Sequence, residues 1–269
     1  MITGVLGTLT PLDIAIVVVG GVVAGVLNYA AAGGSLVSFL VLGSMGVPPQ
    51  MANATNLVAT PASFIAAVPR ATKDLRDLRR RWPVFIAAIV GTVAGVYAFY
   101  KVPAPEFRRV VPVLLLVATA TLVMHPIIQR VIERRHERRH DDGKHDHMTL
   151  ITVGVFVTSV YAGFFGGGVG VLVLVVLGTL AAWPWLEANR FKNLICLMTS
   201  TVGMFAYAAT GLVDVPMAIL LFVSLGTGGV LGRHLVARLS RDEKGDLESV
   251  LRQVVAMGAS FGAGVMIAT

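Results

Sequence analysis

The chain has 269 residues, of which 55% are apolar and 14% charged, and its mean hydropathy is +0.78. Because a soluble domain carries about 25% charged residues, this composition excludes one. Long apolar runs separated by short charged clusters predict an all-α polytopic membrane protein, and their continuity excludes the alternating pattern of a transmembrane β-barrel.

The net charge of +7 comes from basic residues that are confined to a few loops between the apolar runs. No aromatic platform accompanies them, so they indicate cytoplasmic loops near anionic lipid rather than a surface for nucleic acid. We therefore expect a multi-pass protein of the cell membrane whose main basic loops are cytoplasmic. Its partners should include membrane lipid and no nucleic acid, and a homodimer is left open.

The first half of the chain contains five apolar segments. The segment at 12–32 is followed by a short one at 35–46 and by a third at 50–69. A strongly basic stretch at 70–81 precedes the segments at 82–102 and 110–128, which a tight turn at 103–106 separates. One crossing needs about 20 residues, so the short segment spans with difficulty. A re-entrant hairpin is the alternative.

The second half repeats this plan after a hydrophilic stretch at 129–147. Its apolar segments are at 149–165, 169–182, 194–210, 215–231 and 247–268, with a charged loop at 233–246. The residues Trp183-Pro184-Trp185 interrupt it after the short segment, and 187–193 is expected to be a turn. We therefore divide the chain into a first transmembrane repeat at 1–128, a charged cytoplasmic connecting loop at 129–148 and a second repeat at 149–269.

The loops indicate how the two halves are oriented. At an offset of about 137 residues, the basic stretch 70–82 corresponds to 211–216, which has no Arg or Lys, and the short turn 103–109 corresponds to the charged 232–246. Equivalent loops have exchanged charge character, so they should face opposite sides of the membrane. This pattern predicts two inverted-topology repeats of about five segments each, with both termini outside.

Each half also contains a glycine-rich interruption of an apolar run. Four of the five positions 166–170 are glycine, and a fainter version occurs at Gly33 and Gly34. Glycine costs about 1 kcal/mol against alanine inside a helix, and broken backbone in a membrane must line protein or a water-filled cavity. Two breaks in matching positions predict a transporter whose substrate binds between them, with a broken or re-entrant helix pair in each repeat.

The order of these motifs resembles a known family. A glycine-rich break, a short apolar run, Gly46-Val47-Pro48-Pro49 and then Ala52-Asn53-Ala54-Thr55-Asn56, repeated in diverged form, is similar to the TauE/SafE family of sulfite exporters. The resemblance covers residues 12 to 268. It implies a two-repeat secondary carrier for sulfite, sulfonates or related organosulfur anions, with no ATPase domain in the chain.

An anion with several charged oxygens needs N–H donors and positive potential, which the start of a half-helix supplies. Polar side chains near the breaks could add amide and cationic contacts. The expected substrate-binding residues are Gly33, Gly34, Ser35, Asn53, Thr55, Asn56, Gly166, Gly167, Gly168, Asn189, Arg190, Lys192 and Asn193.

Structural alternatives exist for each group of these residues. The glycines could serve close helix packing, and the asparagines and threonine near 53–56 could cap a helix. Arg190 and Lys192 could anchor an ordinary cytoplasmic loop. Ser63, Thr199, Ser200 and Thr201 are expected to bond their own backbone or a neighbouring helix.

The remaining motifs do not predict an enzyme. His136, His140, His145 and His147 leave a transition-metal transporter as the alternative function, but they stand among Arg, Glu and Asp as in a solvated loop, and we expect no metal site. The chain has no nucleophile–base pairing, P-loop or dinucleotide fingerprint. We therefore expect no catalytic residues and no cofactor, and a small sulfur-containing anion as the partner.

Overall fold

The computed structural model describes residues 10–68, 81–120, 148–181, 183 and 185–239, and these residues form helices and no strand. The helices are α1 (Pro11–Ala30), α2 (Gly34–Ser44), α3 (Pro49–Ala59), the 3-10 helix η2 (Thr60–Ala67), α6 (Trp82–Lys101), α8 (Met148–Phe164), α9 (Val169–Val176), the π-helix η4 (Leu177–Ala181), α10 (Trp185–Ala208) and α11 (Val215–Leu239). Residues 104–120 are also helical.

Three of these helices, α1, α6 and α11, are long and apolar enough to cross a membrane. They expose apolar side chains such as Val19, Val90 and Val223, each more than half exposed. An apolar outer face is what lipid requires of a spanning helix. The all-α membrane class predicted from composition is therefore confirmed for the part of the chain that the structure describes.

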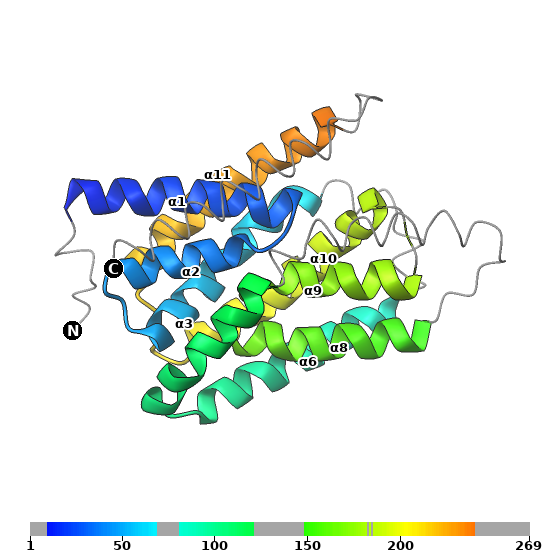
Figure 1. Cartoon of the computed structure of the whole chain (residues 1–269), viewed down its shortest axis with the longest axis horizontal. Helices are drawn as coiled ribbons and strands as arrows, with labels where there is room; N and C mark the ends of the chain where they lie inside the picture. The colour runs from blue at the N-terminus through cyan, green and yellow to red at the C-terminus, as the bar shows by residue number, and fades with distance from the viewer. Residues whose placement is uncertain (1–9, 69–80, 121–147, 182, 184, 240–269) are drawn as a thin grey trace.

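Four of the helices pack in two pairs, α1 with α11 and α6 with α8. Figure 1 shows one pair along each side of the molecule, with the short helices α2, α3 and α9 between them. Glycines bring each pair close: a Cβ at Gly25 would lie 2.9 Å from Gly228 Cα, and one at Gly95 would lie 2.9 Å from Gly163 Cα. Small residues at such contacts let helix backbones approach closely. Each pair joins one helix of the first half to one of the second.

The short helices α2 and α9 begin where the sequence predicts breaks. α2 follows Gly33 (φ 87°) and α9 follows Gly168 (φ 75°), both in the left-handed conformation that glycine adopts at least cost. α2 has 11 residues, so it is about 16 Å long. The hydrocarbon core of a bilayer is about 30 Å thick, and α2 therefore cannot cross it alone.

Two helix starts and one helix end differ from the sequence prediction. α10 begins at Trp185 rather than at 194, so residues 187–193 are helix and not a turn. The last described helix of the first half begins at residue 104 rather than at 110. At its C-terminal end, α11 continues to Leu239, past the predicted end at 231. In each case the apolar run is shorter than the helix, because Glu, Lys and Arg favour helix without raising the hydropathy.

Several predicted segments lie outside the described residues. These are the basic stretch 70–81 except Arg81, the end of the fifth segment, the connecting loop with its histidines, and the last segment at 247–268.

Candidate functional site

The first break joins the end of α1 to the start of α2. The side chain of Asn28, in the last turn of α1, accepts at Oδ1 from the backbone N–H of Ser35 over 2.9 Å and donates from Nδ2 to Ser63 Oγ over 3.1 Å. Asn28 is 3% exposed, so both bonds are buried. The N–H groups in the first turn of a helix have no partner within that helix. Asn28 supplies the acceptor for one of these groups in α2.

The second break lies between α8 and α9. Gly166 and Gly168 both have positive φ angles, 76° and 75°, which side chains other than glycine rarely adopt. Tyr161 donates from its hydroxyl to Gly167 O over 2.8 Å, and Tyr207 donates to Gly163 O over 2.6 Å. Side chains therefore satisfy the carbonyl groups that the interrupted helix leaves free.

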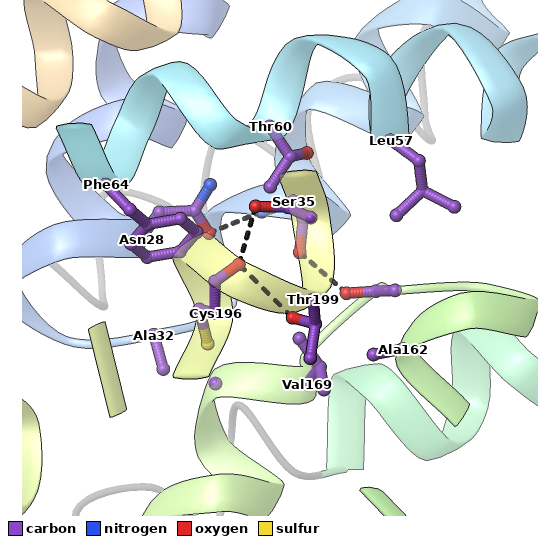
Figure 2. Close-up of a pocket in the computed structure, with 13 residues that line it drawn as sticks. Asn28, Ala32, Ser35, Leu57, Thr60, Phe64, Ala162, Val169, Cys196 and Thr199 are labelled. Carbon is purple, nitrogen blue, oxygen red and sulfur yellow. Dashed lines mark hydrogen bonds between the residues drawn. The ribbon is translucent and has the colours of Figure 1, made fainter. Parts of the chain in front are cut away.

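The two breaks contact one another directly. Ser35 Oγ donates to Gly166 O over 3.0 Å, although the residues are 131 positions apart. A cavity of about 20 Å³ lies beside this bond. Figure 2 shows Asn28 and Thr60 on one side of it and Cys196 and Thr199 of α10 on another. Such a volume accommodates roughly one water molecule.

The cavity is lined by residues from both halves of the chain: Asn28, Ala32, Ser35, Leu57, Thr60, Phe64, Ala162, Gly166, Val169, Gly170, Cys196, Thr199 and Ser200. Two of the predicted site residues, Ser35 and Gly166, are among them. Asn28 is not among the predicted site residues, and its signal in the sequence is a lone amide inside the apolar run 12–32.

Asn53 and Asn56 of α3 donate hydrogen bonds to backbone carbonyl groups at the two breaks. Asn56 donates from Nδ2 to Ser35 O over 2.9 Å and accepts at Oδ1 from Ser38 over 2.6 Å. Asn53 donates from Nδ2 to Phe164 O, at the end of α8, over 3.0 Å. Helix capping is wrong for these two residues, because the N-cap of α3 is Pro48, with no side-chain bond.

Thr55 is turned away from the breaks. Its hydroxyl accepts from the backbone N–H of Asp214, just before α11, over 3.0 Å. Asp214 in turn accepts at Oδ1 from Met217 N over 3.1 Å, as the capping residue of α11. The structure therefore places Thr55 at a helix start of the second half and not beside the cavity.

Three side chains of α10 converge on the end of α1. Lys192 donates from Nζ to Asn28 O over 2.9 Å, and Asn193 and Asn189 donate from Nδ2 to Tyr29 O over 3.2 Å and 3.4 Å. These carbonyl groups lie at the negative end of the α1 dipole, where a cation is stabilised. Lys192 is 0% exposed, so this cation is wholly buried.

Lys192 also borders the second break. A Cβ added at Gly170 would lie 3.5 Å from Lys192 Cδ and 3.0 Å from Ala32 Cβ. Cys196, one helical turn beyond Lys192, lines the cavity. The lysine side chain therefore passes between the two breaks and ends beside the carbonyl groups of the first. Arg190 is exposed, so of the two predicted cations only Lys192 lies at the breaks.

The predicted glycines have different roles. Gly33, Gly166 and Gly168 supply the left-handed turns, and Gly167 O accepts the Tyr161 hydroxyl. A Cβ at Gly34 would lie 1.9 Å from Ala24 O, so close packing against α1 requires glycine there. The predicted hydroxyl–backbone bonds are present for Thr199 and Ser200, which both donate to Cys196 O.

Three buried amide oxygens at the breaks, those of Asn53, Asn189 and Asn193, accept no hydrogen bond from the described residues. Each of these amides donates through Nδ2 to a backbone carbonyl, which fixes which atom is the oxygen. A buried acceptor without a donor is unfavourable by about 1–3 kcal/mol, so these oxygens are suited to a bound molecule that brings a donor. Among the described residues no three His, Cys, Asp or Glu side chains form a possible metal site.

Known proteins resemble this chain over most of its length. The family described as "Sulfite exporter TauE/SafE" matches residues 17–265, which confirms the resemblance found in the sequence motifs. A protein of Haemophilus influenzae named "Probable membrane transporter protein" is 25% identical over 195 residues, which are 71% of this chain and 72% of the relative. No solved structure matches the chain significantly. The chain belongs to the TauE/SafE family of sulfite exporters.

Proposed function

We propose that the protein is a secondary transporter that moves sulfite or a related sulfur-containing anion, such as a sulfonate, across the cytoplasmic membrane by alternating access. The family description names sulfite exporters, and the relative is named a probable membrane transporter. The observation that carries the proposal is the bond from Ser35 Oγ to Gly166 O, which joins two helix breaks beside a cavity. Transporters commonly bind their substrates at such breaks.

The groups around the breaks suit an anion. The starts of α2 and α9 carry backbone N–H groups that can donate to an anion bound beside them. Lys192 adds a buried cation, and the amides of Asn53 and Asn56 lie beside the same backbone. We propose that the substrate contacts the substrate-binding residues predicted from the sequence, except Thr55 and Arg190. Asn28 is added to this set.

The described conformation is closed around the site. A sulfite ion has four heavy atoms, whereas the cavity of about 20 Å³ holds roughly one water molecule. Binding therefore requires the two breaks to separate and the Ser35–Gly166 bond to open. This is the motion that alternating access assigns to two halves moving against each other around one site.

The same proposal includes two repeats of inverted topology, 1–128 and 149–269, in the cell membrane with basic loops in the cytoplasm. The support is that each half has a long helix, a left-handed glycine and a short helix in the same order. The helix pairs are also reciprocal: α1 of the first half packs against α11 of the second, and α8 of the second half packs against α6 of the first. Two related halves would give this arrangement, because α1 corresponds to α8 and α6 corresponds to α11.

The test is uptake of labelled sulfite into proteoliposomes that contain the full chain, with protein-free liposomes as the blank. We expect saturable uptake, and a reduction of tenfold or more in Asn56→Leu, which removes both amide bonds at similar side-chain volume. Thr201→Val is the matched control, because Thr201 bonds only its own helix, at Leu197 O. Absence of uptake for sulfite and for every sulfonate tried would refute the function.

A further inference from the structure

We propose that the site takes anions of a single negative charge, with hydrogen sulfite as the form of sulfite that is carried, and that Lys192 is the residue that selects them. This inference rests on the proposed function, and it concerns the charge of the substrate rather than its chemical family. It follows from the charges that the structure places around the two breaks.

Lys192 is the cation of the site. The two buried charged side chains among the described residues are Lys192 and Asp214, and Asp214 caps α11 through Met217 N. Lys192 has no carboxylate within ion-pair distance in the described part of the chain, where the recorded ion pair is Arg81 with Glu187. Its ammonium group therefore brings one uncompensated positive charge to the breaks.

The helix dipoles do not change the net charge of the site. An N-terminus carries about +0.5 charge and a C-terminus about −0.5. Each break brings together one helix end and one helix start, α1 with α2 and α8 with α9, so the four partial charges cancel to a first approximation. The site then has a net charge close to +1, which one monoanion neutralises.

A dianion would leave one negative charge without a counter-charge in a buried site, where ionic groups are costly unless they are paired. Lys192 has the donors to reach a monoanion, because an ammonium has three N–H groups and one of them is used by Asn28 O. Its side chain already lies against the position of a Cβ at Gly170, a residue that lines the cavity.

The free amide oxygens favour a protonated anion. Asn189 and Asn193 flank Lys192 on α10, and their Oδ1 atoms accept no hydrogen bond from the described residues. Hydrogen sulfite has an O–H group that can donate to such an oxygen, whereas sulfite has none. One buried cation beside two free acceptors therefore matches a singly charged oxyanion that keeps its proton.

The experiment compares two competitors of similar size and different charge at one pH. Labelled sulfite uptake into proteoliposomes is measured with equal concentrations of methanesulfonate, a monoanion, or sulfate, a dianion. We expect methanesulfonate to inhibit at least tenfold more strongly than sulfate. Without competitor, uptake at fixed total sulfite should fall about tenfold for each pH unit above the pKa of hydrogen sulfite, as its fraction does. Equal inhibition, or uptake that follows the dianion concentration, would overturn the inference and leave the function standing.

Variants test whether Lys192 is the residue that selects monoanions. Lys192→Arg should keep the preference for methanesulfonate, and Lys192→Gln should lose it together with at least nine-tenths of the uptake. Arg190→Gln is the control on the same helix, because Arg190 is exposed, and it should behave as the wild type. A Lys192→Gln protein that folds and still prefers methanesulfonate would contradict the role of Lys192.

A binding measurement separates the inference from the transport function. Purified wild-type protein in detergent should be stabilised against thermal unfolding by methanesulfonate and not by sulfate, and Lys192→Gln should lose this difference. If the shift is seen without any flux, the transport function is wrong and the charge selection holds. If neither anion shifts unfolding and no flux is seen, both are wrong.

Discussion

Lys192 Nζ lies 2.9 Å from the backbone oxygen of Asn28, although the two residues are 164 positions apart in the chain. A lysine of the second half thus occupies the carbonyl end of the broken helix of the first half. The reverse relationship exists at the other break, where Asn53 of the first half binds Phe164 O. Each break therefore receives a hydrogen bond to at least one of its carbonyl groups from a side chain of the opposite half of the chain.

The first prediction concerns the carbonyl end of α8. Tyr207→Phe removes the hydroxyl that donates to Gly163 O over 2.6 Å and leaves that buried acceptor without its donor. We expect a loss of about 1–3 kcal/mol in unfolding free energy, read as a lower melting temperature in detergent. The matched control is Tyr97→Phe, because Tyr97 is 63% exposed. Equal melting temperatures for the two variants would show that this bond does not stabilise the break.

The second prediction uses two glycines of one helix. Gly34→Ala would place a Cβ 1.9 Å from Ala24 O, whereas a Cβ at Gly43 meets nothing within 4 Å. We expect Gly34→Ala to destabilise the protein by several kcal/mol or to prevent folding, since backbone must move. Gly43→Ala should be neutral or stabilise α2 by up to about 1 kcal/mol.

The measurement is the amount of monodisperse protein together with its melting temperature. A Gly34→Ala protein as stable as Gly43→Ala would mean that α1 and α2 pack less closely than described.

The sequence was sufficient for the elements that depend on apolar length and on glycine. The segment predicted at 12–32 is α1 at Pro11–Ala30, and both predicted breaks contain left-handed glycines. These features are local, because hydropathy sets a spanning helix and a positive φ angle selects glycine.

The sequence was insufficient where a side-chain direction depends on the helix register. If residues 187–193 form a turn, as the sequence predicts, Arg190 and Lys192 are equivalent cations. Once α10 begins at Trp185, residues 189, 192 and 193 share one face, because positions three and four apart are neighbours on a helix. Arg190 then lies on the exposed side. The same spacing joins Asn53 to Asn56 and turns Thr55 away.

The third prediction uses Cys196, the single cysteine of the chain, as a reporter of opening. It is buried and lines the cavity, so a small neutral maleimide should react with it only when the breaks separate. Ser35→Ala removes the bond to Gly166 O and should weaken the closed state by about 1 kcal/mol. A shift of that size changes the open population about fivefold.

The label rate of Cys196 in proteoliposomes should therefore rise about fivefold in Ser35→Ala. Ser44→Ala is the control, because Ser44 donates within its own helix to Val41 O, and it should leave the rate unchanged. If all three proteins react at the same rate, the Ser35–Gly166 bond does not hold the site closed.

The last prediction tests whether the two breaks move apart during transport. Ala32 stands in the first break and Gly170 in the first turn of α9, and a Cβ at Gly170 would lie 3.0 Å from Ala32 Cβ. Disulfides join Cβ atoms about 3.5–4.5 Å apart, so a relaxation of a few tenths of an ångström allows a bond between cysteines at both positions. The background is Cys196→Ala, which removes the competing thiol.

Oxidation of the Ala32→Cys/Gly170→Cys protein should abolish anion uptake, and a reducing agent should restore it, because the disulfide fixes the closed arrangement across both halves. Each single cysteine variant, treated with the same oxidant, controls for direct damage and should keep its uptake. Mass spectrometry of a protease digest establishes the cross-link independently of transport. Full uptake by a protein whose cross-link is complete would mean that the anion crosses without separation of the breaks at these residues, and the closed cavity would then not be the binding site.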